Sequence, residues 1–82
     1  MPFVKQEKRP ELDKIYDAMC EANIVADGDL NYVLYKYAKH ELRFSYNNLK
    51  NFIAELRECG AQIRSDFLVP YERIKKQENG DV

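Results

Sequence analysis

Basic and aromatic side chains gather between residues 32 and 43 of this sequence, and they are the groups best suited to binding chemistry. Ammonium and guanidinium groups attract anions, and a tyrosine ring can stack on a planar ligand or serve as a contact residue in a protein interface. The pattern predicts a surface for a small anionic, nucleotide-like ligand at a subunit boundary, or for a partner protein. Its candidate residues are Tyr32, Tyr35, Lys36, Lys39 and Arg43.

The same basic residues have a second explanation. Residues 10–29 contain six acidic side chains and a single basic one, Lys14. If the helices that carry the two groups lie against each other, the acids face the bases as solvated ion pairs, which stabilise a fold very little. The sequence leaves both explanations open.

Catalysis and metal binding find no support in the sequence. His40 is the only histidine, and Glu41 beside it points elsewhere on a helix, because adjacent helical residues do not face each other. Cys20 and Cys59 belong to no CxxC or Cys/His cluster, and no phosphate-binding or hydrolase motif is present. We expect no enzyme activity, no metal and no cofactor.

Nucleic-acid binding is a weaker alternative. The break at residues 43–45 between two helical patterns could be the turn of a helix-turn-helix, which would present Asn47, Lys50, Asn51 and Arg57 to the major groove. The net charge of −1 lacks the positive footprint of such proteins. We therefore expect nucleic acid not to be the partner.

Length and composition place the chain among small folded proteins. Its 82 residues are 45% hydrophobic, with six tyrosines, and a chain this short builds a core of little margin. No apolar run is long enough to span a membrane, and the start lacks a secretory signal. These features predict a cytoplasmic protein with reduced thiols, which gains stability from a partner subunit.

Two shorter helices are expected in the first half. The first begins at Pro10, a residue favoured in the first helical turn, and ends near Asn23. The second runs from about Leu30 to Leu42, after a loop in which Asp27 or Asp29 caps its start.

A third, longer helix begins with Ser45 as its N-cap, and Phe44 and Leu49 are expected to form a hydrophobic staple across that cap. The helix ends or kinks at Pro70, because proline lacks the N–H that a helix interior requires. One apolar stripe follows it through Gly60 without losing phase: Leu49, Phe52, Ile53, Leu56, Cys59, Gly60, Ile63 and Phe67.

This third helix is too long for the first two to cover. Helices of about 14 residues span ~20 Å, whereas one of about 22 residues spans ~33 Å. The uncovered end must be buried by Phe3 and Val4 folding back, or by the same helix of a second subunit. We favour a homodimer or higher oligomer, with Gly60, Ile63 and Phe67 as the self-association residues.

The predicted fold is all-α: three antiparallel helices, the third long, with short extended tails, assembled as an oligomer. Residues 1–82 are expected to form a single domain, with an extended N-terminal segment over residues 1–9. The helical core spans residues 10–69, and residues 70–82 form a C-terminal segment, either one or two helical turns or extended.

Three stretches resemble a family of very small, uncharacterised bacterial and bacteriophage proteins. They are the start "MPFVK", where the family more often shows "MPYIK", the helix start "GDLNY", and the ending "PYE…ENGDV". The resemblance implies a small helical protein without a known activity, and through it we add Asn31 and Tyr71 to the candidate binding residues. The family positions matched here are Gly28, Asn31, Tyr32, Pro70, Tyr71, Glu72, Asn79, Gly80 and Asp81.

The function expected from these features is non-catalytic binding by a homo-oligomer, in the manner of a phage-borne modulator of a host protein. Sequestration of a small anionic ligand is the alternative.

Overall fold

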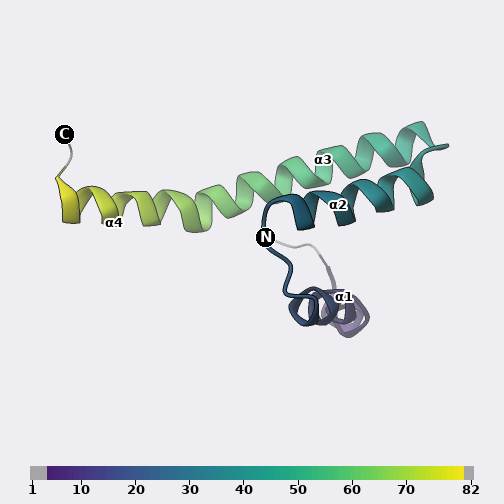
Figure 1. Ribbon diagram of the computed structural model, residues 1–82, viewed down its shortest axis with the longest axis horizontal. Helices are drawn as coiled ribbons and strands as arrows, with labels where there is room; N and C mark the ends of the chain where they lie inside the picture. The colour runs from purple at the N-terminus through teal and green to yellow at the C-terminus, as the bar shows by residue number, and fades with distance from the viewer. Residues whose placement is uncertain (1–3, 81–82) are drawn as a thin grey trace. The chain divides into compact units, whose positions relative to one another are not determined.

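The computed structural model describes residues 4–80, which form helices and turns without a strand in that range (Figure 1). The all-α prediction is confirmed. The chain divides into two compact units, residues 1–44 and residues 45–82. The first contains helices α1 and α2, and the second contains one continuous helical segment of 34 residues, 46–79, which confirms the long third helix.

Helix α1 spans Arg9–Glu21, with Pro10 in its first turn. A 3₁₀ turn at Gln6–Lys8 precedes it, so this part of the tail is helical rather than extended as predicted, whereas Phe3 lies outside the described residues. The helix ends near the predicted Asn23, whose φ of 52° is left-handed. Asparagine tolerates that conformation, and the N–H groups of Asn23 and Ile24 donate to Cys20 and Met19 in a Schellman motif.

Helix α2 spans Gly28–Tyr37, and a π-helical turn at Ala38–Leu42 continues it. Both candidate capping residues take part at its start. The Asp27 carboxylate accepts a hydrogen bond from the Asp29 N–H (3.4 Å), and the Asp29 carboxylate accepts one from the Val25 N–H (3.1 Å). The first bond caps the helix and the second holds the preceding loop against it.

Helix α3 spans Tyr46–Ile63, and the predicted N-cap is confirmed, because the Ser45 hydroxyl accepts a hydrogen bond from the Asn48 N–H at 3.3 Å. The predicted staple is wrong. Phe44 is 89% exposed, and its ring lies under the guanidinium of Arg43, 4.4 Å from the ring centre. A cation–π contact with the adjacent residue thus replaces the apolar contact with Leu49.

The helix passes through Pro70 and continues as α4, Val69–Asn79. A π-helical turn at Arg64–Leu68 joins α3 to α4, and within it the N–H of Val69 donates to the carbonyl of Arg64, five residues back. This wider turn changes the hydrogen-bond register immediately before the residue that lacks an N–H, so the chain continues without a break. Residues 70–79 are therefore helical, which decides between the two conformations that the sequence left open.

No residue between 4 and 80 is buried. The least exposed positions are nearly all apolar and recur at helical spacing: Val4, Ile24, Leu30, Leu34, Ala38, Leu42, Ser45, Leu49, Phe52 and Val69. The described helices therefore expose apolar faces of the kind that fill a core in a stable folded protein.

Candidate functional site

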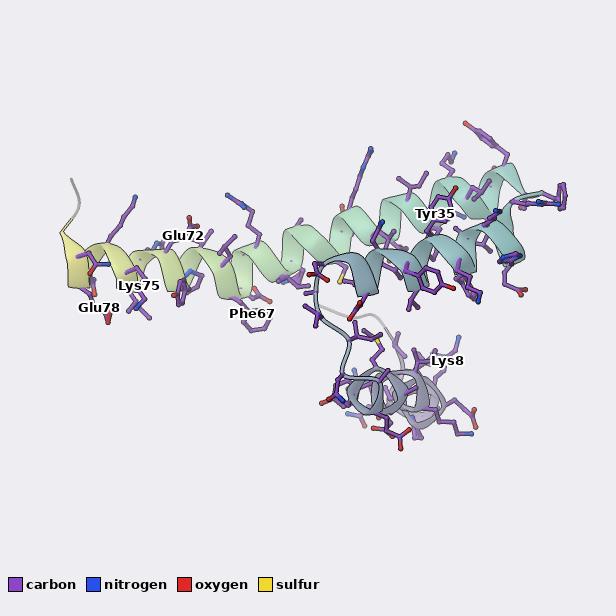
Figure 2. All side chains as sticks on the ribbon, in the orientation of Figure 1. Lys8, Tyr35, Phe67, Glu72, Lys75 and Glu78 are labelled. Atoms are coloured by element: carbon purple, nitrogen blue, oxygen red, sulfur yellow. The ribbon has the colours of Figure 1, made fainter. Side chains whose placement is uncertain are left out.

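Helix α2 and the π-helical turn after it position the basic and aromatic residues of the first unit. Lys36 reaches back one turn to Tyr32, where its ammonium donates a hydrogen bond to the hydroxyl (3.4 Å) and lies 5.5 Å from the ring centre. Tyr35 projects from the helix with 67% of its surface exposed (Figure 2). The structure thus joins Tyr32 and Lys36 into one polar and aromatic surface, with Asn31 on the same helix.

Lys39 lies within the π-helical turn, and Arg43 follows it, with its guanidinium over Phe44. Within residues 4–80 neither residue forms an ion pair with a carboxylate, and Lys36 forms none either. The predicted ion pairing between the acids of α1 and these bases is therefore not observed. Two ion pairs within residues 4–80 join side chains three residues apart on the same helix. Glu11 pairs with Lys14 on α1, and Lys75 pairs with Glu78 on α4 (Figure 2).

Tyr71 belongs to the second unit, on α4. The ammonium of Lys75, one turn further along, lies 5.7 Å from the centre of its ring, as Lys36 lies over Tyr32 in the first unit. Each pair is local to its own helix, and such exposed cation–π contacts stabilise a helix by about 0.5–1 kcal/mol.

The predicted self-association residues lie on the continuous helix 46–79. Ile63 is 50% exposed, and Phe67 is 67% exposed and projects from the π-helical turn (Figure 2). Gly60 lies in mid-helix, where glycine costs about 1 kcal/mol relative to alanine. Apart from the adjacent residues and the nearby backbone of the same helix, no described atom lies within 4 Å of the position that a Cβ would take there. Contacts along helix 46–79 therefore give no steric reason for glycine at this position.

The apolar stripe of this segment is longer than the sequence predicted. With Ile53 and Gly60 assigned to its flank, the remaining members up to Ile63 alternate in steps of three and four residues, the repeat of a coiled-coil helix. The next step, from Ile63 to Phe67, is one residue too long for that repeat. The π-helical turn Arg64–Leu68 lies at that point and absorbs the extra residue. The stripe, named the seam from here on, therefore runs through Leu49, Phe52, Leu56, Cys59, Ile63, Phe67, Tyr71 and Ile74.

Sequence reasoning missed Tyr71 and Ile74 as members of the seam. The signal was present in the sequence. The step of four residues from Cys59 to Ile63 recurs from Phe67 to Tyr71, displaced by one residue from the seven-residue repeat, and Ile74 follows three residues later. Pro70 obscured it, because a proline ordinarily ends a helix.

The other candidate reactive groups are isolated. Cys20 and Cys59 are free thiols and exposed. A hydrogen bond with the Cys20 side chain raises the pKa of Tyr16, one turn away on α1. Within residues 4–80 no three histidine, cysteine, aspartate or glutamate side chains lie close enough to hold a metal ion. Across the same residues, no helix has the length and apolar character needed to cross a membrane.

Comparison with known proteins identifies the family of the chain but not a function. The chain belongs to the family described as a domain of unknown function, DUF6899, whose pattern matches residues 1–82. No curated protein and no solved structure matches the chain. The membership agrees with the resemblance found in the sequence, and it assigns no substrate or partner.

Proposed function

We propose that this chain is a non-catalytic helical interaction protein that works as a homo-oligomer. The observation that carries the proposal is the seam on helix 46–79. From Leu56 to Ile74 all its members are exposed, and no residue between 4 and 80 is buried. A soluble monomer rarely leaves so long a contiguous apolar face in water, and such faces mark protein interaction sites.

The energetics of a short chain support the same conclusion. Ordering a residue costs roughly 1–2 kcal/mol of backbone entropy, and burial of apolar surface is the main term that offsets this cost. Isolated helices of 10 to 15 residues are marginal in water, which applies to α1 and α2. Burial of the seam between subunits supplies the missing apolar contacts, so folding and assembly are coupled.

Residues of the 32–43 surface support a second candidate function, the binding of a small anion. Lys36, Lys39 and Arg43 lack carboxylate partners within residues 4–80, and Tyr32 and Tyr35 expose their rings beside them. This arrangement suits a phosphate next to a planar base. The expected site is at a subunit boundary, where a second chain encloses the ligand.

A thermal-shift panel of nucleotides distinguishes the second candidate from the first. A ligand at one hundred times its Kd adds ~2.7 kcal/mol to the stability of the protein that binds it. A clear rise in melting temperature with any nucleotide supports the anion site. The absence of any rise across the panel removes this candidate.

The biological role we propose is that of a cytoplasmic modulator of a host protein in bacteria or their phages. The resemblance of the chain to small bacterial and phage proteins supports it. The tyrosines outside the seam, such as Tyr35, supply contact residues for that partner.

The oligomer is tested by measuring the mass of the protein in solution over a wide range of concentration. Light scattering coupled to gel filtration and sedimentation velocity should both give at least twice the chain mass, and helicity should fall on dilution as the oligomer dissociates. A monomeric mass at every concentration, together with unchanged helicity on dilution, would refute the proposal.

A further inference from the structure

The seam has an internal symmetry that specifies how two copies can meet. Its exposed part runs from Leu56 to Ile74, and its midpoint is Ser65, inside the π-helical turn. From that midpoint the seam residues lie at equal distances on both sides: two residues to Ile63 and to Phe67, six to Cys59 and to Tyr71, and nine to Leu56 and to Ile74. A helix with this pattern is complementary to an inverted copy of itself.

We propose that two chains pair through the seam as antiparallel helices, with a two-fold axis at Ser65 in the π-helical turn. The proposal rests on the proposed function and adds to it the surface, the partner and the orientation. An isologous two-fold contact, in which the same patch is used twice, is the commonest way in which identical chains close an oligomer.

The antiparallel arrangement produces layers in which the two residue types differ. Ile63 faces Phe67 of the second copy, Leu56 faces Ile74 of the second copy, and Cys59 faces Tyr71 of the second copy. Each layer therefore pairs one residue from each half of the segment, and the smallest side chain of the seam meets one of the largest. Alternation of large and small residues across an interface fills space without voids.

A parallel arrangement packs less evenly. It would place each seam residue against its own copy, so that two Phe67 rings and two Tyr71 rings share layers while two Cys59 side chains share another. Layers of such different volume force either overpacking at the rings or a cavity at the thiols.

The antiparallel arrangement also explains why position 60 is a glycine. It lies beside the seam, on the flank that Ile53 and Leu68 also occupy. In the antiparallel pair the flank of one helix meets the same flank of the other, so Gly60 faces Leu68 of the second copy. Beyond the adjacent residues and the nearby backbone of the same helix, no described atom lies within 4 Å of a Cβ position at Gly60, and this open space is the space that the leucine fills.

The exposed area is sufficient for a stable contact. Six large residues of the exposed seam and its flank are 41–67% exposed: Leu56, Ile63, Phe67, Leu68, Tyr71 and Ile74. With roughly 150–200 Å² of surface for each, they present about 500–600 Å² per chain. Two copies therefore bury about 1,000–1,200 Å², which reaches the size of a specific interface. The seam carries no charge from Leu49 to Ile74, so no ion is desolvated in its centre.

Spin labels on the native Cys59 test the orientation. In a C20S protein, a nitroxide on Cys59 is the only label of each chain. The antiparallel pair separates the two Cys59 residues by twelve residues along the axis, ~18 Å, a distance that pulsed electron paramagnetic resonance resolves. Labels in direct contact, seen as strong dipolar broadening, would overturn the antiparallel orientation and show a parallel pair.

Crosslinking with a short bis-maleimide gives an independent readout. The C20S/Y71C protein should form covalent dimers, because each Cys59 then faces the new thiol of the second copy. C20S alone and C20S/C59S/Y71C, which keeps a thiol only at position 71, should stay uncrosslinked. Crosslinking of either control at the same rate as C20S/Y71C would overturn the proposed register.

The result separates this inference from the proposed function. A dimeric mass without any crosslink or resolved distance places the contact elsewhere, which refutes the seam pairing and leaves the homo-oligomer standing. A monomeric mass at all concentrations refutes both.

Discussion

Replacement of Phe67 by alanine is the sharpest test of the seam. The side chain is 67% exposed in the chain, and in the antiparallel pair it packs against Ile63 of the second copy. About 100 Å² of the ring's surface is lost on truncation. At ~25 cal/mol per Å² this corresponds to roughly 2–3 kcal/mol for each copy, or about 5 kcal/mol for the symmetric pair.

The expected effect is therefore a large rise in the Kd of the dimer. Since 1.4 kcal/mol corresponds to a tenfold change, a loss of about 5 kcal/mol means that F67A should weaken the pair by a factor of ~10³–10⁴. Sedimentation equilibrium over a range of concentration measures this directly. Loss of helix propensity does not explain such a change, because alanine favours a helix more than phenylalanine does.

Tyr35 supplies a matched control. It is also an aromatic residue with 67% of its surface exposed, it belongs to helix α2 of the first unit, and it is not a member of the seam. Y35A should leave the Kd of the dimer nearly unchanged. If F67A leaves the association curve where it was, or if Y35A moves it equally far, the reasoning from the seam is refuted.

Three further predictions follow from the site and the helix ends. K36E/K39E should abolish any nucleotide-dependent thermal shift while leaving the oligomer mass unchanged. The control K5E/K8E, an equal change of charge outside residues 32–43, should leave both the thermal shift and the mass unchanged. Nucleotide binding that persists in K36E/K39E would refute the anion site. S45A should destabilise the start of α3 by about 1 kcal/mol, because the Asn48 N–H loses its capping partner. Amide exchange at the start of α3 should be faster in S45A and unchanged in the control variant S65A. Equal exchange in S45A and the unaltered protein would contradict the cap. C20A should lower the pKa of Tyr16 toward its usual value, because the hydrogen bond with Cys20 is the main cause of its rise. The raised pKa stabilises the folded chain at pH values below the usual tyrosine pKa, and this stabilisation is lost as the pH rises through the raised value. An NMR titration that shows the same Tyr16 pKa in C20A and in the unaltered protein would refute Cys20 as the cause.

Local chemistry predicted the helix ends well. Ser45 was recognisable as a cap because its hydroxyl can accept from an N–H three residues on. Asp27 before α2 and Asp29 in its first turn were recognisable because their carboxylates can accept from nearby backbone N–H groups. Such interactions join residues two to four positions apart, so they can be read from a short window of sequence.

The staple at Phe44 failed for a related reason. The pattern of Phe44, Ser45 and Leu49 fits a staple, but the ring of Phe44 is 89% exposed and contacts the guanidinium of Arg43 instead. A sequence motif predicts one of the contacts that a side chain can form, whereas the structure shows which contact is formed.

The candidate binding residues were predictable as a surface but not as a site. Helical spacing places Lys36 one turn from Tyr32, and the structure shows a contact between them. Tyr71 has its own basic neighbour, Lys75, on another helix. Whether these two aromatic and basic pairs serve one ligand is a property of the assembly, and no local pattern encodes it.

Side-chain periodicity and capping residues alone indicated that this chain is helical, where its helices begin, and that its longest helix carries a long apolar face. These properties depend on side-chain periodicity and capping, which act over a few residues. Only the structure decided that the helix passes through Pro70 and that Tyr71 and Ile74 join the seam. The reason is the hydrogen bond from the Val69 N–H to the Arg64 carbonyl. This bond spans five residues instead of four, so it shifts the backbone hydrogen-bond register and rotates every later side chain about the helix axis.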